Sequence, residues 1–345
     1  MTKRPNVFAV FPGQGSQHVG MVKDLFDQFA MARETFEEAS DATGLHIKKL
    51  CFEGPESELT LTENTQPCLL TASVAAFRVA QSELGFFPSA VAGHSLGEYS
   101  ALVAAGSLTL ADAARWVRSR GQAMQKAVPV GEGTMAAVLS LSDDQVLELC
   151  QVATEEAQRK RNAQGSSSIS VEARVEPANF NAPGQVVIAG STDGVAEALA
   201  LVKSDPRFAG GKTIPLQVSA PFHSSLMKPA RDRMAEIFSH LGPQQKPKTL
   251  SCPYVPNRTA RITQEPEVVL ELLVEQVDHP VLWRPSVQVL LDAGFTHAIE
   301  FGPGKVLCGL IKRIASQSQK PCIQQSVQDA TTLKALEKTL EGGLS

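Results

Sequence analysis

The sequence predicts an α/β fold in which a large domain with a parallel β-sheet carries an inserted, smaller ferredoxin-like α+β domain. Three apolar runs, at residues 6–11, 90–92 and 296–301, each stop at a glycine-containing turn that a helical pattern follows. Between residues 133 and 216 the expected order is strand, helix, strand, strand, helix and strand, as in a ferredoxin-like unit. With 345 residues, 43% of them hydrophobic, the chain can bury a substantial core.

The individual elements follow from the spacing of apolar residues and from the glycine and proline residues between them. Runs rich in β-branched residues predict strands, and apolar residues three and four apart predict helices. The expected strands are 6–11, 90–92, 135–141, 175–180, 185–189, 212–218 and 296–301, with a strand end at 253–257 and a short strand near 323. The expected helices start near 21, fill most of 32–85 with breaks at 54–55 and 65–67, and continue at 100–105, 110–127, 143–160, 195–203, after 227, 265–276, about 305–314 and 331–340.

Composition changes after Gly133 and suggests where the domains divide. We expect a small domain over 133–216 and one discontinuous large domain made of 1–132 and 217–345. The charged and then serine-rich stretch 159–168 is expected to be a helix end followed by a flexible loop.

Charge and cysteine usage exclude several classes of protein. The net charge of −4 gives no support for nucleic-acid binding, and no stretch reaches the roughly 18 uninterrupted apolar residues of a membrane span. The six cysteines are scattered without a Cys-x-x-Cys pair, which argues against a disulfide framework or a structural zinc site. We therefore expect a cytoplasmic protein without a metal or a membrane partner.

Residues 93–97 read Gly-His-Ser-Leu-Gly, the Gly-x-Ser-x-Gly pattern of a nucleophile elbow. A side chain at Gly93 or Gly97 would collide with the neighbouring strand or helix in so sharp a turn. Ser95 would then lie at the tip, near the free N–H groups of the following helix, which suit an oxyanion. The alternative is an ordinary serine in a glycine-bracketed turn.

A useful serine nucleophile needs a base, and His223 is the candidate, because it stands where a strand enters a helix. His94 is adjacent to Ser95 in sequence but is expected to be structural. The glycine-rich loop 12–17 lacks the ending of a phosphate-binding loop and the third glycine of a dinucleotide fingerprint. We expect this loop to contribute backbone N–H groups instead, in particular that of Gln14.

Seven segments resemble, in order and spacing, the malonyl-CoA:acyl-carrier-protein transacylases, and the resemblance runs from about residue 7 to 340. They are Pro-Gly-Gln-Gly-Ser-Gln at 12–17, Gly-His-Ser-Leu-Gly-Glu at 93–98, Arg-Gly-Gln-Ala-Met-Gln at 120–125, 181–190, Phe-His at 222–223, Gln276 with 280–283, and 300–304. The resemblance implies an α/β-hydrolase-like large domain, a monomer and no metal or redox cofactor.

The same resemblance implies a role for each matching residue. Ser95 is the nucleophile, and His223 is first the general base and then the general acid. Arg120 pairs with the free carboxylate of the malonyl group, for which a planar guanidinium is well shaped. Two further roles are implied: the backbone N–H groups of Gln14 and Leu96 form the oxyanion hole, and the backbone carbonyl of Gln276 holds His223 in place of a triad acid.

The implied reaction is transfer of malonyl from malonyl-CoA to the phosphopantetheine thiol of acyl carrier protein, with ping-pong kinetics, for fatty-acid synthesis. A discrete acyltransferase of a polyketide pathway is the alternative on the same fold. A serine thioesterase or esterase is a third reading, against which Arg120 argues, since a hydrolase of neutral esters has no use for it.

Some features remain open. Phe222 resembles the bulky residue that favours malonyl over methylmalonyl, or it simply packs in the core. The stretch 155–176 looks longer than in typical family members, and the sequence at 255–258 differs from the one usual in the family.

Arg115 and Arg118 are expected on a solvated face. Carrier proteins are acidic, so a locally basic docking surface is expected, with two candidate sets: Lys305, Lys312 and Arg313, or 159–161.

Overall fold

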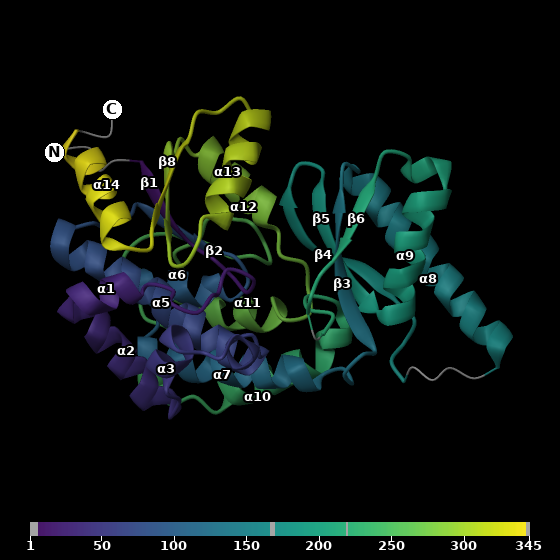
Figure 1. Ribbon diagram of the computed structural model, residues 1–345, viewed down its shortest axis with the longest axis horizontal. Helices are drawn as coiled ribbons and strands as arrows, with labels where there is room; N and C mark the ends of the chain where they lie inside the picture. Colours follow the sequence, from purple (N-terminus) through teal and green to yellow (C-terminus); the bar gives the residue numbers. More distant parts are fainter. Residues whose placement is uncertain (1–5, 166–169, 219, 343–345) are drawn as a thin grey trace. The chain divides into compact units, whose positions relative to one another are not determined.

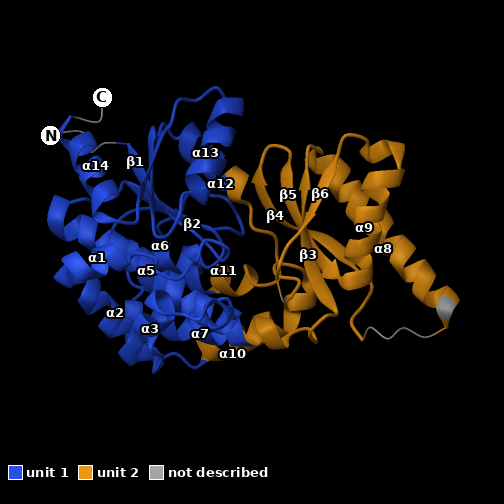
Figure 2. Ribbon diagram, viewed as in Figure 1, with its two compact units in different colours: residues 1–122, 240–270, 286–345 blue, residues 123–239, 271–285 orange. Residues whose placement is uncertain are grey.

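The computed structural model describes residues 6–165, 170–218 and 220–342 and divides into two compact units (Figure 2). Unit 1 comprises Met1–Gln122, His240–Leu270 and Ser286–Ser345, and unit 2 comprises Ala123–Ser239 and Glu271–Pro285. The small domain expected over 133–216 lies within unit 2, which also contains segments on either side of it. The exact domain boundaries stay a prediction.

Unit 1 is built on a five-stranded parallel sheet of order β7-β2-β1-β8-β9 (Figure 1). The central strands β1, β2 and β8 are buried along their whole length, as a sheet covered by helices on both faces requires. The register pairs Phe11 with Gly93, so β1 ends beside the end of β2. The strands are β1 Val7–Phe11, β2 Ala90–Gly93, β7 Tyr254–Val255, β8 His297–Phe301 and β9 Ile323–Val327.

The helices of the chain confirm most of the expected elements. The α-helices are α1 Lys23–Gln28, α2 Ala30–Thr43, α3 Ile47–Phe52, α4 Glu56–Leu59, α5 Thr62–Leu84, α6 Gly97–Ala104, α7 Leu110–Lys126, α8 Asp143–Gln164, α9 Thr192–Ser204, α10 Lys228–Ser239, α11 Val269–Glu275, α12 Trp283–Asp292, α13 Val306–Gln317 and α14 Ala330–Glu341. Short 3₁₀ turns are η1 Pro206–Phe208, η2 Ser225–Met227, η3 Pro243–Gln245 and η4 Pro266–Val268.

The break expected at 65–67 is wrong, because α5 continues through Pro67. Pro67 is the sixth residue of α5, where its missing N–H costs the helix one backbone hydrogen bond, and the burial of this part of α5 compensates for that loss. Gln66 and Pro67 are both buried there. The consequence for the site is that Gln66 has a fixed place on a helix.

Unit 2 contains a four-stranded antiparallel sheet of order β4-β5-β3-β6. The strands are β3 Gly133–Leu139, β4 Val175–Ala182, β5 Gln185–Ser191 and β6 Lys212–Pro215. The order, with α8 after β3 and α9 after β5, confirms the ferredoxin-like prediction. Both helices pack on the sheet through one apolar cluster, for example Leu149 and Ala198 against Ile188.

Two further details of unit 2 concern the segment 271–285 and the end of α8. The free edge of β4 pairs with Val281, whose N–H donates to Ala178 O and whose carbonyl accepts from Phe180 N–H, so that 271–285 joins this unit. Helix α8 continues to Gln164, beyond the expected end at 160, while 166–169 of the expected serine-rich loop lie outside the described residues.

The motif at 300–304 has a structural use in unit 1. The carboxylate of Glu300 is fully buried and accepts the N–H groups of Leu307 at 3.1 Å and Cys308 at 2.8 Å, at the start of α13. Burial raises the pKa of this carboxyl, and the two backbone donors work against that rise. Within the ranges that the structure covers, no helix is long and apolar enough to cross a membrane, and no cluster of three or more metal-ligating side chains occurs.

Candidate active site

The turn between β2 and α6 leaves no room for side chains at its two glycines. A Cβ on Gly93 would come within 1.9 Å of the Gly97 backbone, and one on Gly97 within 2.0 Å of Phe11 O. Ser95, between them, has a φ of +52°, in the left-handed region that a serine rarely adopts. Such strain persists only where the surroundings over-determine it, and it clusters at functional sites.

An asparagine that no sequence motif indicates holds this turn. Asn257 is fully buried; its Oδ1 accepts from Ser95 N–H at 2.6 Å and its Nδ2 donates to Gly93 O at 2.6 Å. Its own N–H donates to Glu98 Oε2 at 3.0 Å. The departure noted at 255–258 therefore contains a residue that contacts the candidate nucleophile, although nothing local in the sequence indicates it.

Arg120 approaches the candidate nucleophile from α7. Its side chain is buried, at 1% exposure, and its Nη2 donates to Ser95 Oγ at 3.1 Å. Its Nη1 donates to Gln66 Oε1 at 3.0 Å, a second contact that no sequence motif indicates. The guanidinium also lies 5.9 Å from the centre of the Tyr99 ring.

Burial lowers the pKa of Arg120, while the nearby Tyr99 and Glu98 act in the opposite direction. An arginine remains protonated at neutral pH even so. A buried cation that contacts a serine hydroxyl is well placed to bind a carboxylate on whatever that serine attacks.

The two predicted oxyanion donors are backbone N–H groups of unit 1. Across the described residues, neither the Leu96 N–H nor the Gln14 N–H makes a hydrogen bond. Leu96 directly precedes α6, and the Gln14 side chain donates to Thr62 Oγ1 at 3.3 Å. Two uncommitted donors are what an oxyanion hole requires. Their role stays a prediction.

The candidate base lies in unit 2. His223 is 4% exposed, has a φ of +62°, and its Nδ1 lies 2.9 Å from Gln276 O. A carbonyl oxygen can only accept, so Nδ1 carries the hydrogen and Nε2 of the neutral ring is left with a lone pair. Gln276 is fully buried, which fixes this carbonyl.

The structure thus brings the predicted residues together in two sets. Ser95 and Arg120 are in contact in unit 1, and His223 and Gln276 are in contact in unit 2. Of the arginines expected on a solvated face, Arg115 is exposed, but Arg118 is half-buried and donates to Thr43 O, so that expectation is wrong for Arg118.

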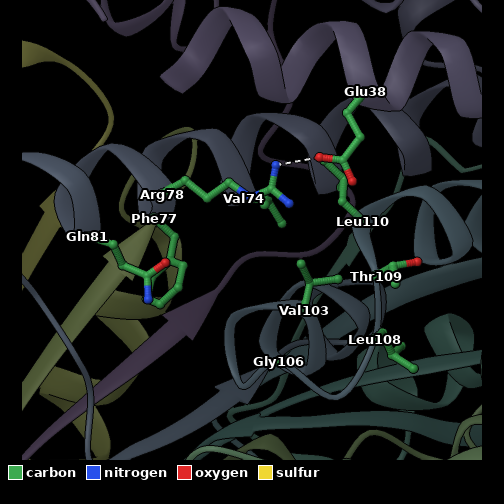
Figure 3. A pocket seen from close by; sticks show the side chains of 10 residues that line it. All are labelled: Glu38, Val74, Phe77, Arg78, Gln81, Val103, Gly106, Leu108, Thr109 and Leu110. Carbon is green, nitrogen blue, oxygen red and sulfur yellow. Dashed lines mark hydrogen bonds and ion pairs between the residues drawn. The ribbon is translucent and has the colours of Figure 1, made fainter. Parts of the chain in front are cut away.

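A separate cavity of about 340 Å³ lies at the other end of α6 (Figure 3). Two of the residues that line it, Arg78 and Glu38, point toward each other and form an ion pair at 2.6 Å. The predicted site residues are not among its lining, which is Glu38, Val74, Phe77, Arg78, Gln81, Val103, Gly106, Leu108, Thr109 and Leu110.

The chain is similar in sequence to a known protein family and to characterised relatives. The acyl transferase domain family matches residues 7–342. The malonyl CoA-acyl carrier protein transacylase of Escherichia coli K12 is 45% identical over 309 residues, which cover 88% of this chain and 91% of the relative.

Two solved structures are similar over almost the whole chain. The acyl-carrier-protein S-malonyltransferase of Burkholderia pseudomallei 1710b is 46% identical, with a TM-score of 0.84, covering 96% of this chain and 99% of that one. A malonyl-transacylase solved in complex with a type II PKS acyl-carrier protein is 40% identical, with a TM-score of 0.84 and the same coverage.

Proposed function

This chain belongs to the acyl transferase family and, within it, to the malonyl-CoA:acyl-carrier-protein transacylases, and from this we propose that it transfers malonyl from malonyl-CoA to the phosphopantetheine thiol of an acyl carrier protein. The observation that carries the proposal is the contact between Arg120 and Ser95. A serine in a nucleophile elbow, beside a buried guanidinium, suits an acyl group that ends in a carboxylate.

In the first half-reaction, His223 Nε2 takes the proton of the Ser95 hydroxyl as Oγ attacks the thioester carbonyl of malonyl-CoA. The N–H groups of Gln14 and Leu96 stabilise the oxyanion of the tetrahedral intermediate. The C–S bond then breaks, and coenzyme A leaves as a thiol with the proton from His223. Malonyl remains on Ser95 as an ester.

In the second half-reaction, the carrier thiol gives its proton to His223 and its sulfur attacks the ester carbonyl. The C–O bond breaks, and Ser95 Oγ recovers the proton from His223. One thioester replaces another, so no water, electron or bound cofactor is consumed, and the phosphopantetheine arrives with the partner. Arg120 holds the malonyl carboxylate through both steps, which favours the carrier thiol over water as acceptor.

The partner class is an acyl carrier protein, and fatty-acid synthesis is the pathway that we propose. A polyketide pathway is the second candidate, because one structural neighbour was solved with a type II PKS acyl-carrier protein. We place the reaction in the cytoplasm, a proposal supported by six cysteines that are all free thiols.

Intact-protein mass spectrometry tests the proposal directly. The protein is mixed briefly with malonyl-CoA and then with a holo acyl carrier protein, and Ser95→Ala is the control. We expect a malonyl adduct on Ser95 that moves to the carrier thiol, and no adduct on the folded control. An adduct that water removes equally fast without the carrier would instead make the protein a thioesterase, and labelling of Ser95→Ala would overturn the nucleophile assignment.

A further inference from the structure

Three residues of unit 1 form a closed ring of hydrogen bonds around the nucleophile turn. Ser95 N–H donates to Asn257 Oδ1 at 2.6 Å, Asn257 N–H donates to Glu98 Oε2 at 3.0 Å, and Glu98 N–H donates to Ser95 O at 3.0 Å. A fourth bond, from Asn257 Nδ2 to Gly93 O at 2.6 Å, ties the ring to the end of β2. Both Asn257 and Glu98 are fully buried, so water does not compete for these bonds.

The turn needs such a support. With a φ of +52°, the Ser95 backbone is in a conformation that a serine leaves readily when nothing opposes it. The Ser95 N–H and the Gly93 carbonyl stand on either side of the turn tip, and one side-chain amide satisfies both. The direction of the Ser95 side chain therefore depends on the placement of Asn257.

Only an asparagine side chain fits this arrangement. Its amide both accepts and donates, whereas an ionised aspartate of the same shape can only accept, and a glutamine is one methylene longer. The sheet sets the position: β7 pairs in parallel with β2, Val91 opposite Tyr254 and Ala92 opposite Val255. Asn257 thus leaves the sheet two residues later, at the same edge as the turn.

Glu98 extends the support to the helix side. It is the second residue of α6, where a negative charge is favourable, and it holds the Asn257 backbone. We propose that Asn257, fixed by Glu98, is a positioning residue that keeps Ser95 Oγ in its reactive orientation. Because one of its assays is acylation by malonyl-CoA, this role rests in part on the proposed function.

The test compares Asn257→Ala and Asn257→Asp with Gln264→Ala. The Gln264 amide also donates to a backbone carbonyl, Leu250 O at 2.8 Å, from the same segment of unit 1 but away from the turn. Two quantities are measured for each folded protein: the transfer of malonyl through Ser95 to a holo carrier protein, as kcat and KM for malonyl-CoA, and the rate of labelling of Ser95 by a fluorophosphonate probe.

We expect kcat to fall about 100-fold in Asn257→Ala and at least about 10-fold in Asn257→Asp, with KM changed less than about threefold, because misplacement of a reacting atom affects the chemical step. Labelling by the probe should fall in parallel. Because Gln264 is exposed, Gln264→Ala should change thermal stability little and leave both rates unchanged.

Several results would overturn the positioning role. They are wild-type rates per folded molecule in both Asn257 variants, an equal loss in Gln264→Ala, or a rise in KM without a fall in kcat. If Asn257→Ala does not fold, Asn257→Asp decides, since it keeps the size and the bond from Ser95; if that variant also fails to fold, the residue is structural and the proposal is wrong. A wild type that reacts with the probe but not with malonyl-CoA would refute the proposed substrate alone.

Discussion

Arg120 places a positive charge where water barely reaches, since its side chain is 1% exposed. Its contacts are the Ser95 hydroxyl, the Gln66 amide and the face of Tyr99, and Glu98 is near enough to favour its charged form. A hydrogen bond to a charged group contributes about 1.5–3 kcal/mol. In the proposed reaction the malonyl carboxylate would gain this interaction, whereas an acetyl group has no carboxylate to gain it.

We therefore predict that Arg120→Ala lowers kcat/KM for malonyl-CoA about 10- to 100-fold, with acetyl-CoA affected less or even favoured. Arg120→Lys is the matched variant: it keeps the charge but loses the planar fork, so it should recover only part of the malonyl activity. Steady-state transfer to a holo carrier with each acyl donor measures both. Equal loss with the two donors would show that Arg120 only supports the turn.

The candidate site was predictable from the sequence only where its signals are local. Ser95 and its glycines form a contiguous motif, whereas the role of Arg120 came from the family resemblance. Gln66 and Asn257 touch these residues from 54 and 162 positions away, and a helix and a strand end place them there. No spacing along the chain encodes such a contact, so neither residue could be predicted from a motif.

At the scale of secondary structure, the prolines were the main source of error. Prolines are expected to break helices, yet Pro67 lies inside α5, and Pro285 is the third residue of α12, a helix that is not among the predicted ones. Pro285 removes no hydrogen bond of its helix, because the first N–H groups have no partner within the helix. Pro67 does remove one, and the burial of Gln66 and Pro67 compensates for it. The central strands β1, β2 and β8 were predicted well because they are short apolar runs that end at a glycine or a proline.

The crossing of α6 with β1 depends on Gly97. A Cβ there would be 2.0 Å from Phe11 O, a backbone atom that cannot move aside. We predict that Gly97→Ala lowers the free energy of unfolding by about 3 kcal/mol or more and abolishes labelling of Ser95 by the fluorophosphonate probe. Gly309→Ala is the control: a Cβ at this exposed position in α13 meets nothing within 4 Å, so helix propensity alone should stabilise the protein by about 0.5–1 kcal/mol.

Chemical denaturation followed by circular dichroism measures both glycine variants. A tolerated Gly97→Ala would contradict the close packing of the turn, and destabilisation by Gly309→Ala would show that the added methyl group does not lie in open space there.

Within unit 2, Arg161 near the end of α8 is paired with Asp193 at the start of α9, with Arg161 Nη2 2.7 Å from Asp193 Oδ1. Burial raises the pKa of Asp193, but hydrogen bonds from Arg161 and Ser191 outweigh it, and the net pKa lies below the ordinary 3.8. A carboxyl whose pKa is lower in the folded state stabilises the protein above the unfolded-state pKa, and that stability is lost as the pH falls through the folded-state pKa.

Asp193→Asn should therefore be less stable than the wild type by about 1 kcal/mol at pH 7, a figure reduced for partial exposure, and the difference should shrink as the pH falls below about 4. Thermal unfolding across this pH range measures it. Glu156→Gln, which removes the partner of the exposed Arg159, should change little at any pH. A stability difference that does not depend on pH would exclude the ion pair as its source.

At the scale of the whole molecule, the net charge of −4 opposes the approach of an acidic carrier protein, so docking requires a local excess of free cations. The two candidate sets of docking cations, 159–161 and the set with Lys305 and Lys312, differ in their ion pairing. Arg159, Lys160 and Arg161 are each paired with an acidic side chain of unit 2. Lys305 and Lys312, by contrast, are exposed on α13 and its cap, and neither has an ion pair among the residues described.

We accordingly predict that the double variant Lys305→Gln and Lys312→Gln raises KM for the carrier protein about 3- to 10-fold and weakens the salt dependence of transfer, while KM for malonyl-CoA stays unchanged. Charges at the edge of an interface act mainly on the rate of encounter, so kcat should hold. Lys160→Gln is the matched control, because its charge is already neutralised by Glu197 at 2.6 Å. If Lys160→Gln raised KM for the carrier and the double variant did not, the carrier would dock on unit 2. Cations that are ion-paired in the free protein would then contribute to docking.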